Sequence, residues 1–272
     1  MKKIISIISC IVALTAVTSC DWFKLDNLDG WDASVEGKII DSATGEPIQM
    51  EQGGSISVYE IYGTQYDHTN QKGVKGWDGK NTIGWTVKNN GTYVNKLTFA
   101  GDYKMKTINN NFQADTVWFS LNSGKNVQDF KVDPYVRIKN PKISISGKVI
   151  NATCELEIGV PGTKISRVEL CVWPDRWVRH SSNNCSGDPY SYVVNPAVGT
   201  TISLSVDPDR VVKSSDGKTE TKPNAEEFQY DRIHYIRIAA LGNNGQNTSS
   251  AYNYSPVYKL EKNGTLTEVT DW

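Results

Sequence analysis

The chain of 272 residues has few of the side chains on which metal and cofactor sites usually depend. It contains three histidines, His68, His180 and His234, and no two of them are close in sequence. Zinc and other transition-metal sites use histidine or cysteine ligands at short, regular spacings. We therefore predict no metal site and no cofactor.

The common catalytic motifs are also missing. There is no Gly-x-Ser-x-Gly elbow, no His-Glu-x-x-His pair and no glycine-rich phosphate loop. Neighbouring acids do occur, such as Asp207 with Asp209 and Glu226 with Glu227, but they lie in polar segments. A glycosidase needs two carboxylates that converge from different segments across a cleft. The sequence thus predicts no catalytic residues and a protein that is not an enzyme; a surface hydrolase is the third and weakest hypothesis.

Net charge is nearly absent as well. The formal charge of −1 provides no field that would favour nucleic acid, so we expect no nucleic-acid partner. Methionine and phenylalanine are scarce, with three and six residues, whereas there are thirteen tyrosines and eight tryptophans. This skew is typical of β-rich domains, and it would also supply flat faces for stacking sugar rings.

The clearest positive signal is at the N-terminus. Lys2 and Lys3 precede an apolar run over residues 4–17, and Thr18 and Ser19 lead into Cys20. This pattern resembles the lipobox of bacterial lipoproteins, which implies a signal peptide over residues 1–19 and lipidation of Cys20. An ordinary secretory signal is the alternative.

Residues 20–33 are rich in aspartate and read as an acidic tether. Its acids are Asp21, Asp26, Asp29 and Asp32. The segment resembles the export tether of Bacteroidetes surface lipoproteins. The expected location is therefore the outer membrane, with a lipid anchor and the protein facing the cell exterior.

The rest of the chain predicts an all-β protein with two tandem antiparallel β-sandwich domains. Short β-type runs alternate with turn residues, and no long stretch has the helical period. About seven strands are expected over residues 34–138, including a hairpin at Asn89-Asn90-Gly91, and about seven more over residues 139–272. The prolines of Asp133-Pro134 and Asn140-Pro141 interrupt the pattern between the two sets and predict a short joint.

Two stretches of the first domain carry a family resemblance. Residues 35–47, Val-Glu-Gly-Lys-Ile-Ile-Asp-Ser-Ala-Thr-Gly-Glu-Pro, resemble the opening of the carboxypeptidase-regulatory-like, transthyretin-like sandwich. Asn90-Gly-Thr-Tyr93 and residues 97–104 resemble its later signature. Residues 234–242 alternate like a late strand of an Ig/fibronectin-like sandwich.

With the lipobox, the whole chain resembles the Bacteroidetes DUF3823 lipoproteins. That resemblance implies an accessory protein of a polysaccharide-utilisation locus, found beside a TonB-dependent importer and its lid lipoprotein. It implies no catalytic or ligand residues at particular positions.

The segment with the most sugar-binding chemistry follows the strand expected over residues 164–173. A sugar site needs flat aromatic platforms beside planar or charged hydrogen-bonding partners. Pro174 predicts that the chain leaves the sheet here, as a loop or an edge strand. The glycan-binding candidates in and near this segment are Trp173, Asp175, Arg176, Trp177, Arg179, Tyr190 and Tyr192, and Trp77 is a further candidate in the first domain. Core packing or domain docking is the competing interpretation of Trp173 and Trp177.

Three cysteines follow the signal and the lipidated residue. Cys171 and Cys185 flank one loop, so their pairing is the first expectation in an oxidising compartment. Pairing of Cys154 with Cys171, or three buried free thiols, stays open.

Two hypotheses about function follow from these patterns. The first is a non-catalytic surface lipoprotein of a glycan-uptake system that binds polysaccharide or oligosaccharide through aromatic platforms. The alternative is a structural or scaffolding subunit of an outer-membrane importer complex, without direct sugar binding.

Overall fold

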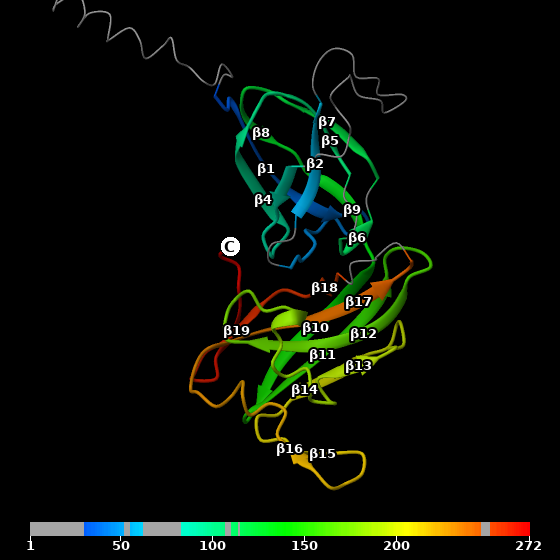
Figure 1. Ribbon diagram of the computed structural model, residues 1–272, viewed down its shortest axis with the longest axis vertical. Coiled ribbons are helices and arrows are strands. Elements are labelled where there is room, and N and C mark those ends of the chain that lie inside the picture. The colour runs from blue at the N-terminus through cyan, green and yellow to red at the C-terminus, as the bar shows by residue number, and fades with distance from the viewer. Residues whose placement is uncertain (1–29, 52–54, 62–82, 107–109, 114, 246–250) are drawn as a thin grey trace, which may run out of the picture. The chain divides into compact units, whose positions relative to one another are not determined.

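The computed structural model describes residues 30–51, 55–61, 83–106, 110–113, 115–245 and 251–272. Residues Ala33–Trp272 form one compact unit. Apart from one 3-10 turn, His180–Ser182, the regular elements among the described residues are strands, which confirms the all-β prediction (Figure 1). None of these residues belongs to a helix long and apolar enough to cross a membrane.

The first sandwich consists of two sheets. One has the order β4 (Thr92–Thr98), β1 (Ala33–Asp41), β9 (Phe130–Pro134) and β6 (Phe112–Gln113), with β8 (Gly124–Val127) also paired to β1. The other has the order β3 (Ile83–Thr86), β2 (Ser55–Ile61), β5 (Gly101–Met105) and β7 (Val117–Leu121). Alternate side chains of these strands meet in one apolar core, in which the rings of Trp85, Tyr93 and Phe130 are buried.

The pairing of β1 differs from the fully antiparallel expectation. β1 runs parallel to both β8 and β9, with Ile39 opposite Phe130 and Glu36 opposite Val127. Parallel neighbours require a long connection between them, and about ninety residues separate these strands along the chain. Alternation within one strand does not reveal the direction of its neighbour.

The hairpin turn at Asn89-Asn90-Gly91 is present. Gly91 adopts a φ of +77° and its amide donates to the Lys88 carbonyl, while the Lys88 amide donates to the Thr92 carbonyl. Beyond the Val87–Tyr93 bridge the two strands separate, because β3 and β4 belong to different sheets. The turn therefore forms a corner of the sandwich.

The second sandwich also has two main sheets. One has the order β10 (Val136–Ser146), β11 (Val149–Ile158) and β14 (Ile202–Val206). The other has the order β13 (Tyr192–Val194), β12 (Lys164–Trp173), β17 (His234–Asn243), β19 (Tyr258–Leu260) and β20 (Leu266–Glu268), with β18 (Asn253–Tyr254) also paired to β17. A separate two-stranded ribbon, β15 (Val212–Lys213) and β16 (Glu220–Thr221), lies apart from these sheets in Figure 1.

The central strands β12 and β17 have two buried faces. Val168, Leu170 and Val172 of β12 point into the core between the two sheets. Cys171 and Ala239 point to the opposite face, where they pack with a smaller apolar cluster that includes Tyr252, Tyr254 and Val257. Burial on both faces is complete over Ile236–Ala240, where side chains of both parities are buried.

The predicted joint at Asp133-Pro134 and Asn140-Pro141 is not a loop. β10 begins two residues after β9 ends and continues through Pro141. The register shifts between Lys139 and Lys142, and Asn140 adopts a φ of +51°, so a bulge accommodates the missing amide.

Contacts within the compact unit tie the two sandwiches together. The Arg137 guanidinium makes a bidentate pair with Asp41, with distances of 2.5 and 2.8 Å. The fully buried Arg237 donates to the main-chain oxygen of Met50 at 3.1 Å and to that of Ser255 at 2.9 and 3.2 Å.

The expected disulfide is wrong in this structure. Cys154, Cys171 and Cys185 are all buried free thiols, which was the third alternative. Cys185 packs into the inter-sheet core beside Leu170, whereas Cys171 points to the other face of β12. Burial raises the pKa of Cys154 to about 11 and also raises the pKa values of Cys171 and Cys185, so none has the thiolate character of a reactive cysteine.

Candidate functional site

An open hollow in the second sandwich has a volume of about 570 Å³. The turn after β10, the segment after β14, the loop over residues 222–232 and the turn between β19 and β20 contribute to its walls. Its size falls within the usual range of small-molecule sites. We call it the Tyr230 cleft.

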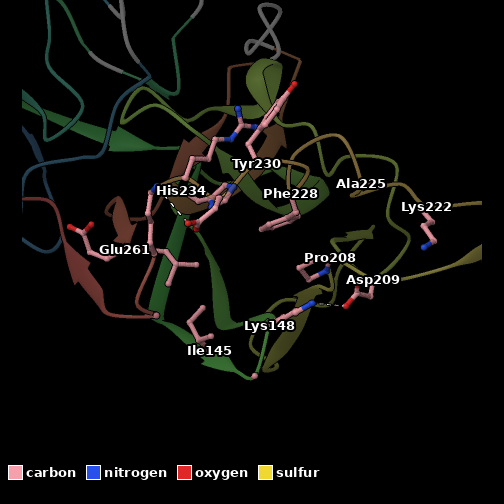
Figure 2. A pocket seen from close by; sticks show the side chains of 16 residues that line it. Ile145, Lys148, Pro208, Asp209, Lys222, Ala225, Phe228, Tyr230, His234 and Glu261 are labelled. Carbon is pink, nitrogen blue, oxygen red and sulfur yellow. Dashed lines mark hydrogen bonds and ion pairs between the residues drawn. The ribbon is translucent and has the colours of Figure 1, made fainter.

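Aromatic side chains form one part of this cleft (Figure 2). Tyr230 is 63% exposed, which is unusual for a large ring, and the Arg232 guanidinium lies 5.9 Å from its centroid. The Phe228 and His234 rings are 4.8 Å apart. Tyr230 therefore offers an open ring beside a packed, apolar wall.

Charged side chains also line the cleft, and four of them form two ion pairs. Lys148 contacts Asp209 at 3.3 Å and Lys262 contacts Asp231 at 3.6 Å. These pairs are largely solvated, so they contribute little stability and their donors and acceptors stay accessible to a polar ligand.

The buried carboxylate of Glu227 lies next to His234, which lines the cleft. Glu227 is fully buried and receives a hydrogen bond from Asn184 at 3.0 Å, with Arg232 and His234 each at 3.3 Å. Burial raises the pKa of Glu227 despite the Asn184 and Arg232 contacts. Burial also lowers the pKa of His234, which favours the neutral imidazole at neutral pH.

The structure groups four of the sequence-predicted site residues. The Trp177 ring lies 5.6 Å from the Trp272 ring, and the Arg176 guanidinium lies 4.8 and 5.2 Å from the two rings. Asp175 accepts a hydrogen bond from the Trp177 amide at 3.0 Å. Trp173 packs against the cluster on the outer face of β12, as Trp272 also does. Trp173 therefore takes part in packing within the second sandwich, and Trp177 is only partly exposed.

The other predicted residues do not join this group. Arg179 pairs with Glu51 at 3.1 Å. Tyr192 stacks on the Arg167 guanidinium at 3.8 Å, and the 63%-exposed Tyr190 on that of Arg210 at 4.2 Å. Trp77 and Cys20 lie outside the described residues.

A second cleft of about 370 Å³ lies next to the Trp177 group, and we call it the Trp272 cleft. It combines Trp272 with polar side chains of the first sandwich, among them Lys38, Glu46, Gln49 and Asn90. Glu268 and Thr270 contribute from the segment that begins with β20.

Sequence reasoning missed both Tyr230 and Trp272. Each follows a polar stretch without strand periodicity, so no face could be assigned to it. The available signal was the two aromatic residues Phe228 and Tyr230, separated by one residue in an otherwise polar loop.

No group of three potential metal-ligating side chains occurs among the described residues.

Known proteins resemble this chain in sequence and in fold. Residues 33–133 match the family described as protein of unknown function (DUF3823), N-terminal domain. A solved structure from Bacteroides uniformis, named a "putative carbohydrate binding protein", is 29% identical, covers 88% of this chain and 100% of its own, and has a TM-score of 0.67. No curated protein matches the sequence.

Two further solved structures share the fold. A DUF3823 family protein from Parabacteroides merdae is 21% identical over 86% of this chain and 100% of its own, with a TM-score of 0.60. One from Bacteroides ovatus is 18% identical over 84% and 97%, with a TM-score of 0.57. The resemblance to DUF3823 proteins inferred from the sequence is confirmed for residues 33–133, which match the N-terminal domain of that family.

Proposed function

We propose that the protein is a non-catalytic glycan-binding protein and that the Tyr230 cleft holds the sugar. The observation that carries this proposal is the exposed Tyr230 ring in an open cleft that is also lined by the solvated ion pairs Lys148–Asp209 and Lys262–Asp231. A sugar ring has an apolar C–H face that stacks on an aromatic ring, and a rim of hydroxyls that need donors and acceptors. The name of the Bacteroides uniformis structure supports the same chemistry.

Affinity electrophoresis of the soluble form, from Asp21 onward, tests this proposal against starch, xylan, galactomannan, pectin and chondroitin sulfate. We expect at least one polymer to retard the protein and Tyr230→Ala to weaken that binding by about 1 to 3 kcal/mol. A well-folded protein that no polymer retards would contradict glycan binding.

Tyr190→Ala is the matched control. Tyr190 has the same 63% exposure as Tyr230 and also has an arginine over its ring, but it does not line the cleft. Loss of binding in Tyr190→Ala with full binding in Tyr230→Ala would move the site to the candidate predicted from the sequence.

The proposal includes a location on the outer membrane, anchored through lipid on Cys20. Cys20→Ser should release or mislocalise the protein, and unchanged retention in the membrane fraction would refute the anchor. Neutralising Asp21, Asp26 and Asp29 should reduce digestion by protease added to whole cells while lipidation continues.

The second candidate is a scaffolding subunit of a TonB-dependent importer and its lid lipoprotein. Val94 and Val127 lie on either side of Glu36 across β4, β1 and β8, and they are 48% and 75% exposed. Apolar side chains gathered on one exposed sheet face favour a protein partner. A stoichiometric complex recovered from native outer membranes, together with no sugar affinity, would favour this role.

A further inference from the structure

The Trp272 cleft has an aromatic surface that the chain itself holds in place. The Trp272 indole nitrogen donates to the Val269 carbonyl at 3.1 Å, and Lys88 donates to the main-chain oxygen of Trp272 at 2.9 Å. Arg176 donates to the Asp271 carbonyl at 3.3 Å while its guanidinium covers both indoles. A ring fixed before the ligand arrives costs less entropy on binding.

The remaining lining of this cleft is polar and comes from both sandwiches. Gln49 and Asn90 supply amides, Thr92 a hydroxyl, and Glu46 and Lys38 opposite charges. Such a mixture of neutral and charged hydrogen-bonding groups beside one aromatic ring matches a sugar ring with its hydroxyl rim.

One hairpin connects this cleft with the Tyr230 cleft. The turn between β19 and β20, with Glu261 and Gly264, lines the Tyr230 cleft, whereas Glu268 at the other end of β20 lines the Trp272 cleft. Tyr258 pairs with Glu268 and Leu260 with Leu266, so the hairpin is regular between the two ends. At about 3.3 Å per residue, the two strand steps from Leu266 to Glu268 account for about 7 Å of the path between the clefts.

We propose that the Trp272 cleft is a second sugar-binding site and that one polysaccharide chain occupies it together with the Tyr230 cleft. This inference rests on the proposed function, because it assigns the same ligand class to both clefts. β20 is the edge strand of its sheet, and Thr267 and Glu268 on it are exposed, so no other strand of the described residues covers the path between the clefts.

Two linked sites predict a particular dependence on ligand length. Once one site is filled, the second binding event is intramolecular, so a long chain binds more tightly than a short oligosaccharide that fills only one site. A short oligosaccharide should bind with a stoichiometry of two, and a polymer should lose most of its advantage when either site is removed.

The test uses whichever of starch, xylan, galactomannan, pectin and chondroitin sulfate retards the protein in affinity electrophoresis. It also uses disaccharide and trisaccharide fragments of that polymer. Titration calorimetry of the fragments should give two sites for the wild type and one for Trp272→Ala. Trp272→Ala should weaken polymer binding at least tenfold, while fragment binding at the Tyr230 cleft stays unchanged. Trp272→Phe, which keeps an aromatic ring, should restore most of the polymer affinity.

Trp118→Ala is the matched control. Trp118 is a partly exposed tryptophan on β7 with the Lys104 ammonium 5.4 Å from its ring, and it lines neither cleft. The Trp118→Ala variant should bind the polymer as tightly as the wild type does.

Three results would count against the inference. Wild-type polymer affinity in folded Trp272→Ala, or a fragment stoichiometry of one in the wild type, would overturn the second site and leave the proposed function intact if Tyr230→Ala still loses binding. If none of the five polymers retards the folded protein, both proposals are overturned.

Discussion

At the residue scale, the buried carboxylates differ in which protonation state the fold prefers. Burial disfavours the charged form of Asp41, but hydrogen bonds from Arg137 and from the Ala43 amide outweigh it, and the pKa of Asp41 is lowered. The charged form therefore stabilises the fold. Asp41→Asn should lower the free energy of unfolding by about 1 to 3 kcal/mol at pH 7 in urea denaturation.

The pH dependence of that loss follows from the direction of the shift. Stability from a carboxyl with a lowered pKa is fully present above its unfolded pKa, and it is lost as pH falls through the folded pKa. The deficit of Asp41→Asn should therefore be constant near neutral pH, begin to shrink only below about pH 4, and disappear as pH falls through the lower pKa of folded Asp41. Glu220→Gln, in a solvated pair with Lys213, is the control and should cost less than about 1 kcal/mol. An equal loss in both variants would contradict the assignment.

Glu227 should behave in the opposite way. Its pKa is raised, chiefly by burial, so the fold favours the protonated carboxyl that Gln imitates. Wild-type stability from this group is present below the unfolded pKa and is lost as pH rises through the folded pKa. Glu227→Gln should therefore gain stability relative to the wild type between pH 4 and pH 8. Thermal denaturation across this range checks it, and a growing deficit for the variant would show that the Arg232 and His234 contacts outweigh burial.

The element scale is best tested at the corner turn between β3 and β4. Gly91 has a φ of +77°, and an added Cβ would lie 2.4 Å from the Ile48 carbonyl oxygen. Both the left-handed backbone and the contact with main chain oppose a side chain, so Gly91→Ala should lower the free energy of unfolding by at least about 2 kcal/mol.

Two other glycines separate the causes of that loss. Gly45 has a φ of +76° with nothing within 4 Å, so Gly45→Ala should show only the backbone cost of about 1 kcal/mol. Gly84→Ala in β3, where the nearest atoms are 3.7 Å away in Ser55, should be nearly neutral. Melting temperatures that rank the three variants differently would contradict this account.

Elements of this fold were predictable where local chemistry determines them. Alternation located most strands, and Asn-Gly located the corner turn, because both depend on neighbours within a few residues. The parallel partners of β1 were not predictable, since Phe130 and Ile39 are about ninety residues apart in the sequence and no local pattern links them. The same limit explains the site: the cleft walls come from segments far apart in sequence, and Tyr230 has no local pattern that distinguishes it.

At the scale of the whole molecule, the two apolar cores are separate, and polar contacts connect the sandwiches. Glu51 of the first sandwich pairs with Arg179 and accepts a hydrogen bond from the Tyr254 hydroxyl at 2.9 Å. The buried Arg237 stacks on Tyr254 at 4.0 Å and reaches the Met50 carbonyl. Nothing in the sequence signals that Arg237 is buried, because its carbonyl acceptors at Met50 and Ser255 are brought to it only by the tertiary structure.

Arg237 should therefore control whether the two sandwiches unfold together. Its side chain has carbonyl acceptors in both halves, so Arg237→Ala removes a link between them and leaves a cavity with unpaired main-chain oxygens. We expect one cooperative transition for the wild type in scanning calorimetry and two resolved transitions for Arg237→Ala. Ile238→Ala is the matched control, since the neighbouring residue of β17 points into the second core instead. The free energy of unfolding of Ile238→Ala should be about 2 to 5 kcal/mol lower than that of the wild type, and the variant should still unfold in one transition. A single transition in Arg237→Ala, displaced like that of Ile238→Ala, would mean that other contacts couple the sandwiches.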